Sequence, residues 1–212
     1  MAVPRAPRPE PRKLPRQQRS RALYDAILTA AAELLESVGP ELTLSEVATR
    51  AGVSSGSLYQ YFPDRPALIA ALIDRQLAHD RDTLRQLREA EFGRESLPQL
   101  LVDGLLGLYG SRPRSMVHMV TLLRELGRDA DVQQLTEQFC DTLAQRLHSE
   151  QPALSTATCR DAARSAVFAL LGVVRQVALD TPERLASDPN LRARLLAIAS
   201  AALPAAPTPT EP

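Results

Sequence analysis

Residues 43–62, TLSEVATRAGVSSGSLYQYF, have the pattern of two short helices joined by a tight turn. Thr43 can cap the first helix with its hydroxyl, and Glu46 three residues later completes a capping box. Gly52 supplies the backbone freedom that a sharp turn requires, and Ser54 is placed to cap the second helix. Because two such short helices cannot bury a core alone, neighbouring segments must complete a helix-turn-helix domain.

The second short helix concentrates aromatic residues. Three of the chain's eight Phe and Tyr residues, Tyr59, Tyr61 and Phe62, fall in its last four positions. Leu58 and Phe62 lie four apart and are expected to face inward, which leaves the polar and tyrosine side chains to project elsewhere. This pattern indicates a surface that reads DNA, with packing of the two tyrosines inside the domain as the alternative.

Longer helices are predicted on both sides of this pair. A helix over about residues 17–38 ends at Gly39 and Pro40. Its expected buried stripe is apolar at helical spacing and consists of Leu23, Ile27, Ala30, Ala31, Leu34, Leu35 and Val38. A second helix over about residues 64–91 is capped by Asp64. Residues 17–63 are therefore the predicted helix-turn-helix domain.

The chain has 212 residues and a formal net charge of zero, but its charges are unevenly distributed. The segment 1–21 holds seven Lys and Arg against Glu10 alone, so positive charge gathers at one end, as a phosphate-binding surface requires. Five prolines in the first fifteen residues predict a disordered basic arm over residues 1–16. Such an arm can lie in a DNA minor groove or can be a solvated tail without a defined role.

The remaining sequence has helical periodicity throughout and no convincing strand pattern. Further helices are expected over about 97–111, 115–126, 132–150, 156–179 and 189–203, followed by a disordered, proline-rich tail at 204–212. The predicted fold is all-α. A long helix joins the N-terminal three-helix domain to a second helical domain over residues 64–203.

The segment LTLSEVATRAGVSSGSLYQYFPDRPAL, preceded by an amphipathic helix, resembles the TetR family of bacterial transcriptional regulators over about residues 17–77. The resemblance implies phosphate contacts from Thr43, Tyr61 and Arg65. It also places the start of the second helix and its outer face in the DNA major groove: Ser54, Ser55, Gly56, Ser57, Tyr59 and Gln60. A glutamine can pair bidentately with adenine, so Gln60 is the expected base reader. Ser55 stands where the family often has a basic residue.

The same resemblance implies an effector site in the helical domain. Helix bundles bind small molecules between their helices, and methionine adapts to irregular apolar shapes. The alternative for each residue is ordinary core. The expected pocket residues are apolar and come from several helices: Leu105, Tyr109, Met116, Met119, Leu123, Phe139, Leu143, Phe168 and Leu171. Few charged groups fall on the inward faces, so a largely apolar effector is expected.

A stripe of small residues on the helix at 156–179 would let a second helix approach closely. The resemblance implies that this helix and the last one pair with their symmetry mates. The expected interface residues are Ala162, Ser165, Ala166, Ala169, Gly172, Leu195, Ile198, Ala199 and Ala202. A symmetric dimer would place two recognition helices about 34–36 Å apart on a palindromic operator.

Other functional classes have little support in the sequence. We find no carboxylate pair, nucleophile elbow, metal motif or phosphate loop in a suitable context, so neither an enzyme nor a cofactor is expected. His79, Asp80 and Asp82 lie on a charged helix face and are interpreted as solvated surface. No apolar run of about eighteen residues suggests a membrane span, so a cytoplasmic protein is expected.

These features predict a homodimeric transcriptional repressor that an apolar small molecule releases from double-stranded DNA. The alternative is a helical protein-interaction or ligand-sequestering module that has lost specific DNA binding.

Overall fold

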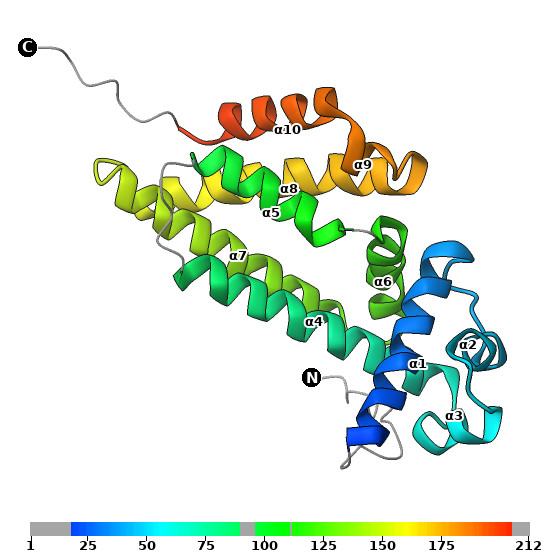
Figure 1. Cartoon of the computed structure of the whole chain (residues 1–212). Helices are drawn as coiled ribbons and strands as arrows, with labels where there is room; N and C mark the ends of the chain where they lie inside the picture. Colours follow the sequence, from blue (N-terminus) through cyan, green and yellow to red (C-terminus); the bar gives the residue numbers. More distant parts are fainter. Residues whose placement is uncertain (1–17, 90–95, 111, 205–212) are drawn as a thin grey trace, which may run out of the picture. The chain divides into compact units, whose positions relative to one another are not determined.

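The computed structural model describes residues 18–89, 96–110 and 112–204, and these residues form helices with no strand among them (Figure 1). The expected all-α fold is confirmed. The predicted arm at 1–16 and residues 205–212 of the predicted tail lie outside the described residues. The helices are α1 (Gln18–Ser37), α2 (Leu44–Ala51), α3 (Ser55–Tyr61), α4 (Arg65–Glu89), α5 (Leu97–Tyr109), α6 (Pro113–Glu125), α7 (Asp129–Glu150), α8 (Thr156–Asp180), α9 (Arg184–Ser187) and α10 (Pro189–Ala202).

The chain forms two compact units, and each unit consists of two separate stretches of the sequence. The first unit extends to Asp80 and includes Arg114–Asp129, and the second contains Arg81–Pro113 and the chain from Ala130 onward. The predicted domain boundary at residue 64 does not coincide with this division. The part of α4 up to Asp80 and α6 from Arg114 onward group with the helix-turn-helix, because their apolar faces are part of its core.

The first unit has an apolar core to which α1, α2, α3 and α4 contribute buried side chains. Its side chains come from each helix and from the intervening turn, and their exposure is close to zero: Ile27, Leu35, Leu42, Val47, Leu58, Phe62, Leu68, Ile69, Leu72 and Ile73. Val38 was expected in this core, but 55% of it is exposed. The reason is local: α1 ends at Ser37, and Gly39 at a φ of 87° turns the chain away from the helical stripe.

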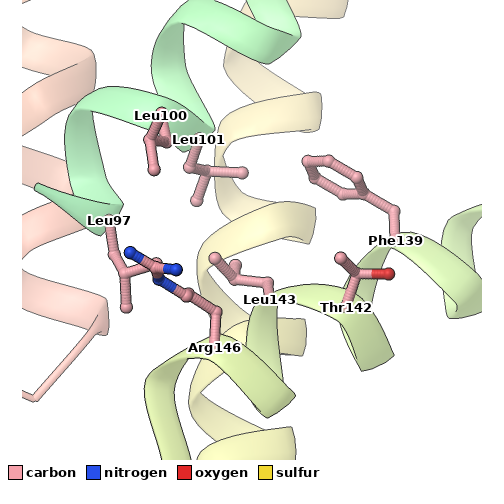
Figure 2. A pocket seen from close by; sticks show the side chains of 7 residues that line it. All are labelled: Leu97, Leu100, Leu101, Phe139, Thr142, Leu143 and Arg146. Atoms are coloured by element: carbon pink, nitrogen blue, oxygen red, sulfur yellow. The ribbon is translucent and has the colours of Figure 1, made fainter. Parts of the chain in front are cut away.

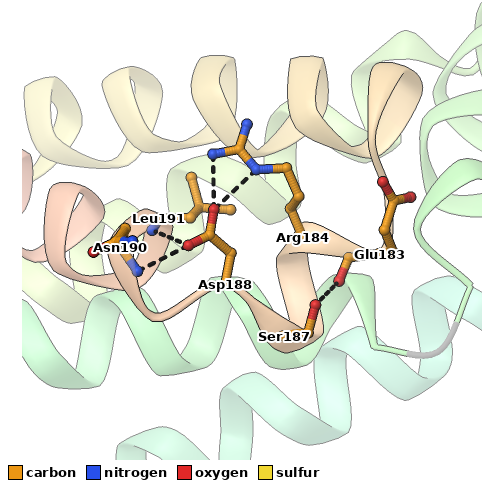
Figure 3. Close-up of polar contacts among 6 residues, drawn as sticks. All are labelled: Glu183, Arg184, Ser187, Asp188, Asn190 and Leu191. Atoms are coloured by element: carbon orange, nitrogen blue, oxygen red, sulfur yellow. Dashed lines mark hydrogen bonds and ion pairs between the residues drawn. The ribbon is translucent and has the colours of Figure 1, made fainter.

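In the second unit, α5, α8 and α10 pack against one another. The corner before α10 is fixed by Asp188, whose carboxylate accepts hydrogen bonds from the backbone N–H groups of Asn190 (2.9 Å) and Leu191 (3.2 Å), as Figure 3 shows. The same carboxylate accepts two bonds from the Arg184 guanidinium, at 2.9 and 2.8 Å. Arg184 and these backbone donors hold the pKa of Asp188 below its usual value. The short helix α9, which the sequence pattern did not predict, lies just before this corner.

Candidate nucleic-acid interface

The first helix of the predicted helix-turn-helix begins at a complete capping box. The Thr43 hydroxyl oxygen accepts from the Glu46 N–H at 3.3 Å, and the Glu46 carboxylate accepts from the Thr43 N–H at 2.8 Å. The Thr43 hydroxyl also donates to that carboxylate at 2.7 Å. The predicted cap is therefore confirmed. The expected phosphate donor, the Thr43 hydroxyl, is exposed but already has Glu46 as a partner.

The turn between the helices depends on one glycine. Gly52 has a φ of 66°, in the left-handed region, and its N–H donates to carbonyls at the end of α2. The N–H of Val53 donates to the Ala48 carbonyl at 3.0 Å, which closes the turn. Ser54 then caps α3 by accepting from the Ser57 N–H at 3.1 Å. The turn at Gly52 and the Ser54 cap are thus those that the sequence pattern predicts.

The outer face of α3 consists of small and uncharged groups. Ser55, Gly56 and Gln60 are exposed, and 49% of Tyr59 is exposed although its neighbour Leu58 is fully buried. Ser57 is partly buried, and its hydroxyl forms a hydrogen bond of 2.9 Å with the Ser54 hydroxyl. This face offers hydroxyl, amide and phenol groups at one surface, which are the groups that can reach base edges or phosphates.

Tyr61 does not lie on this face. Only 6% of it is exposed, and its ring packs against Tyr24 and Phe62 at centroid distances of 6.0 and 6.4 Å. Its hydroxyl lies 2.8 Å from the Ser20 hydroxyl on α1. For this tyrosine the geometry supports the packing alternative over the expected phosphate contact. The partner is 41 residues away in sequence, so the local pattern carried no sign of it.

Arg65 also has partners within the chain. Its Nε donates to the Leu42 carbonyl at 3.2 Å, and its Nη2 donates to the Pro40 carbonyl. The guanidinium therefore satisfies two carbonyls of the turn between α1 and α2. The expected phosphate contact would use donors that these carbonyls do not occupy. Arg50, which sequence reasoning did not single out, is exposed on α2 and pairs with Glu33 at 2.8 Å.

The capping box makes the stability of this unit depend on pH. Hydrogen bonds from the Thr43 side chain, and then from its backbone, lower the pKa of Glu46 below its ordinary 4.5. A lowered carboxyl pKa stabilises the fold above the unfolded-state value, and this contribution is lost as the pH falls through the folded-state value. We expect Thr43→Ala to raise the Glu46 pKa toward 4.5, as measured by NMR titration of its carboxyl carbon.

The same substitution removes a helix cap and should lower the free energy of unfolding by about 1 kcal/mol at neutral pH. Thr49→Ala is the matched control, because the Thr49 hydroxyl only donates to the Ser45 carbonyl within α2 at 3.0 Å. An unchanged Glu46 pKa in Thr43→Ala would contradict this account of the cap.

The residues of the predicted pocket do not come together in one unit. Met116, Met119 and Leu123 belong to the first unit, and the other six belong to the second. Leu105 and Tyr109 are buried and Leu171 is partly buried, whereas 49% of Phe168 is exposed on α8. Phe168 therefore points away from its unit's core, and it does not line the groove between α5 and α7 described below.

A half-open groove lies between α5 and α7, as Figure 2 shows. Its enclosed volume is about 40 Å³, and its lining is apolar apart from the Thr142 and Arg146 side chains. Phe139 and Leu143 of the predicted set line it, together with residues that sequence reasoning missed: Leu97, Leu100, Leu101, Thr142 and Arg146. The missed leucines have the same helical spacing as ordinary core, so their sequence carried no distinguishing signal.

The predicted interface residues separate into two groups. Ser165, Ala169 and Gly172 are exposed on α8, and Ala162, Ile198 and Ala202 are partly exposed. The other three are at most 1% exposed and face the interior of their own chain: Ala166, Leu195 and Ala199. Including these three was wrong, because α5, α8 and α10 cover them within one chain.

The middle of α8 exposes apolar and small residues. Phe168 and Leu179 are 49% and 39% exposed, and no atom lies within 4 Å of the position that a Gly172 Cβ would occupy. Contrary to the sequence expectation, α8 is long and apolar enough to cross a membrane by length and composition alone. The core helix of a soluble protein meets the same criterion, and α8 packs against α5 and α10.

Groups that could bind a metal do not gather in the part of the chain that the structure describes. No cluster of three or more His, Cys, Asp or Glu side chains occurs there. Cys140 and Cys159 are buried free thiols, and burial is the main cause that raises the pKa of Cys140 to about 11. Cys140 is therefore not poised as a thiolate.

The capped helix pair with an exposed α3 defines a helix-turn-helix protein. Residues 27–72 match the family model described as bacterial regulatory proteins, tetR family. An uncharacterized HTH-type transcriptional regulator, YvdT of Bacillus subtilis, is 33% identical over 63 residues. That match covers 29% of this chain and 32% of the relative, so it spans about a third of the relative's length.

Solved structures share the fold over most of the chain. SmeT, the repressor of a Stenotrophomonas maltophilia multidrug efflux pump, is 18% identical with a TM-score of 0.57, covering 89% of this chain and 96% of that one. A transcriptional regulator from Aquifex aeolicus is 19% identical with a TM-score of 0.58, covering 82% and 96%. Residues 27–72 are thus similar to the TetR family of bacterial regulatory proteins, and the solved structures show that the fold is shared over most of the chain.

Proposed function

We propose that this protein is a homodimeric transcriptional repressor that binds operator DNA through α3 and leaves it when a largely apolar small molecule binds the second unit. The observation that carries the proposal is the exposed, uncharged face of α3, held by caps at the start of both helices. A buried Leu58 anchors this face while Tyr59 and Gln60 stay accessible.

Recognition of the operator's base sequence is assigned to the exposed residues of α3. Gln60 can form two hydrogen bonds with adenine, and Tyr59 can contact a thymine methyl group or a phosphate. Because α3 itself has no charged residue, most of the affinity must come from elsewhere, including dimerisation and positive groups outside α3. Tyr61 is assigned to packing and not to phosphate binding.

The dimer surface is assigned to the exposed face of α8. Ser165, Phe168, Ala169 and Gly172 present apolar and small groups there, which allow close approach of the same helix from a second copy. Partly exposed Ile198 and Ala202 extend the surface onto α10. A symmetric dimer requires a palindromic operator with two half-sites.

The effector is assigned to the second unit, with the groove between α5 and α7 as its point of entry. The enclosed volume of about 40 Å³ is far smaller than a site for a drug-sized molecule, so an effector of that size requires the groove to widen. Among structures with the same fold, SmeT has been solved in complex with triclosan. That complex supports testing apolar molecules first as effectors of this protein.

Substitutions in α3 test the DNA-reading part of the proposal. We expect Tyr59→Ala and Gln60→Ala each to weaken binding about tenfold, because a good base contact contributes about 1–3 kcal/mol. Both side chains are exposed, so the free energy of unfolding should change by less than about 0.5 kcal/mol. Binding is measured by fluorescence anisotropy on duplexes that the wild-type protein selects from a random library.

Tyr61→Phe is the matched control. It removes the hydroxyl bonded to Ser20 and should lower the free energy of unfolding by about 1 kcal/mol, with DNA affinity changed less than threefold, or about 0.6 kcal/mol. A loss of affinity in Tyr61→Phe equal to that in Tyr59→Ala would restore the phosphate role of Tyr61. Failure of the wild-type protein to select any duplex would favour the alternative module without specific DNA binding, which the lack of a basic residue in α3 also fits.

A further inference from the structure

The start of α6 is attached to the end of α1. The N–H of Ser115, a residue only 3% exposed, donates to the Glu36 carboxylate at 2.7 Å. Glu36 thus satisfies a backbone donor in the first turn of α6, where a negative charge is also favoured by the helix dipole. One turn further along, the His118 ring lies 3.6 Å from where a Cβ on Gly39 would be.

The end of α6 is attached to α4. Gly127, at a φ of 63°, ends the helix, and the next residue, Arg128, has a side chain only 5% exposed. Its Nη2 donates to the Asp74 carboxylate at 2.6 Å, and its Nη1 approaches the Ala70 carbonyl at 3.4 Å. A buried guanidinium with a charged partner at this distance forms a strong, directional hydrogen bond.

The next residue of α4 makes the corresponding connection to α1. The Arg75 guanidinium donates to the Leu28 carbonyl at 2.8 Å and to the Thr29 hydroxyl at 3.2 Å. Successive residues of α4, Asp74 and Arg75, therefore bind the end of α6 and the middle of α1. These polar contacts join α1, α4 and α6 around the apolar core that supports α3.

We propose that Arg128 is a positioning residue that makes α6 move as one body with the helix-turn-helix. The chain enters and leaves this unit at the two ends of α6, next to Arg114 and Asp129. A displacement that reaches either end is then transmitted to α1 and α4, and through them to α3, because both ends are fixed by charged hydrogen bonds. Without Arg128, the turn after Gly127 absorbs the displacement.

Hydrogen exchange of the full-length protein, resolved by mass spectrometry, tests this without knowledge of the effector. In Arg128→Ala, amides of α6 and the following turn should exchange about tenfold faster, because local opening no longer breaks the charged hydrogen bond between the buried guanidinium and Asp74. Exchange in α2, α3, α8 and α10 should stay within about twofold of wild type. Asp74→Asn should accelerate exchange in the same amides. The Asp74 carboxylate is 62% exposed, so this substitution leaves the packing of the α6 side chains intact.

Two controls separate positioning from general destabilisation. Arg192→Ala removes an exposed bidentate pair with Asp103, at 2.8 Å, in the second unit and should leave α6 exchange unchanged. Arg128→Lys keeps a positive charge within reach of Asp74 and should restore most of the protection. Equal acceleration in all helices of the first unit, or unchanged exchange in α6, would overturn the proposal.

A second arm rests on the proposed function and uses a duplex that the wild-type protein has selected. Bound DNA should slow exchange in α2, α3 and α6 of the wild type, but only in α2 and α3 of Arg128→Ala. If no duplex is selected, DNA binding itself is refuted, while the DNA-free comparison still decides whether Arg128 positions α6. If DNA slows exchange in α6 equally in both proteins, the positioning role is wrong and the proposed function stands.

Discussion

Replacing Gly172 with arginine is expected to convert the proposed dimer into monomers and to abolish high-affinity operator binding. Gly172 lies on the exposed face of α8, and a Cβ added there meets no atom within 4 Å, so the single chain accommodates the side chain. In a symmetric dimer each new arginine would lie close to its own copy across the axis, and like charges at an interface cost several kcal/mol.

We expect the dimer dissociation constant of Gly172→Arg to rise at least about hundredfold, measured by sedimentation equilibrium across micromolar concentrations. Affinity for a two-half-site duplex should fall by a similar factor, whereas a single half-site should bind equally well in both proteins. The cause is loss of paired recognition helices and not damage to either one.

Gly107→Arg on α5 provides the matched control. Gly107 is also an exposed helical glycine with open space at its Cβ position, but it lies outside the α8 surface. It should dimerise as the wild type does. A dimer of wild-type strength in Gly172→Arg would show that the exposed face of α8 is not the interface.

Replacing Phe62 with alanine is expected to cause the largest loss of stability. Phe62 is fully buried at the end of α3, where its N–H donates to the Leu58 carbonyl, and its ring lies 5.2 Å from that of Tyr24. Removing a buried Phe side chain costs about 3–5 kcal/mol, since the remaining cavity closes only in part. Urea denaturation at one fixed protein concentration measures the change.

Phe168→Ala tests whether this cost comes from burial. Phe168 is 49% exposed and contacts the Arg164 guanidinium at 5.5 Å, an exposed cation–π contact contributing about 0.5–1 kcal/mol. Measured at a concentration where both proteins are monomeric, it should cost at most this amount. A Phe62→Ala variant as stable as Phe168→Ala would contradict the assigned core.

The local signals in the sequence were reliable because the interactions they encode are local. The caps at Thr43 and Ser54 use partners three residues away, so the residue types and their spacing are sufficient to predict them. The turn at Gly52 is predictable for the same reason. The helix starts at Leu97 and Thr156 also fall where the apolar periodicity placed them.

The phosphate contacts expected of Tyr61 and Arg65 stay predictions, and both side chains have intrachain partners that are distant in sequence. Tyrosine is a residue type that can contact DNA, but the Tyr61 hydroxyl is hydrogen-bonded to that of Ser20, which lies 41 positions earlier. Arg65 resembles a phosphate anchor in sequence, yet carbonyls at Pro40 and Leu42 accept its hydrogen bonds. In both cases a side chain able to bind DNA is engaged by another part of the chain, and residue type cannot distinguish the two outcomes.

The sequence by itself determined the all-α fold, the two capped helices and the exposure of Ser55, Tyr59 and Gln60 on α3, since these follow from backbone hydrogen bonding and a 3.6-residue period. Only the tertiary structure decided which face of α8 is covered. Ser165 and Ala166 are adjacent small residues, but about 100° of helical rotation places one in solvent and the other against the core. It also decided that α6 belongs with the helix-turn-helix, because Glu36 and Asp74, far away in sequence, hold its two ends.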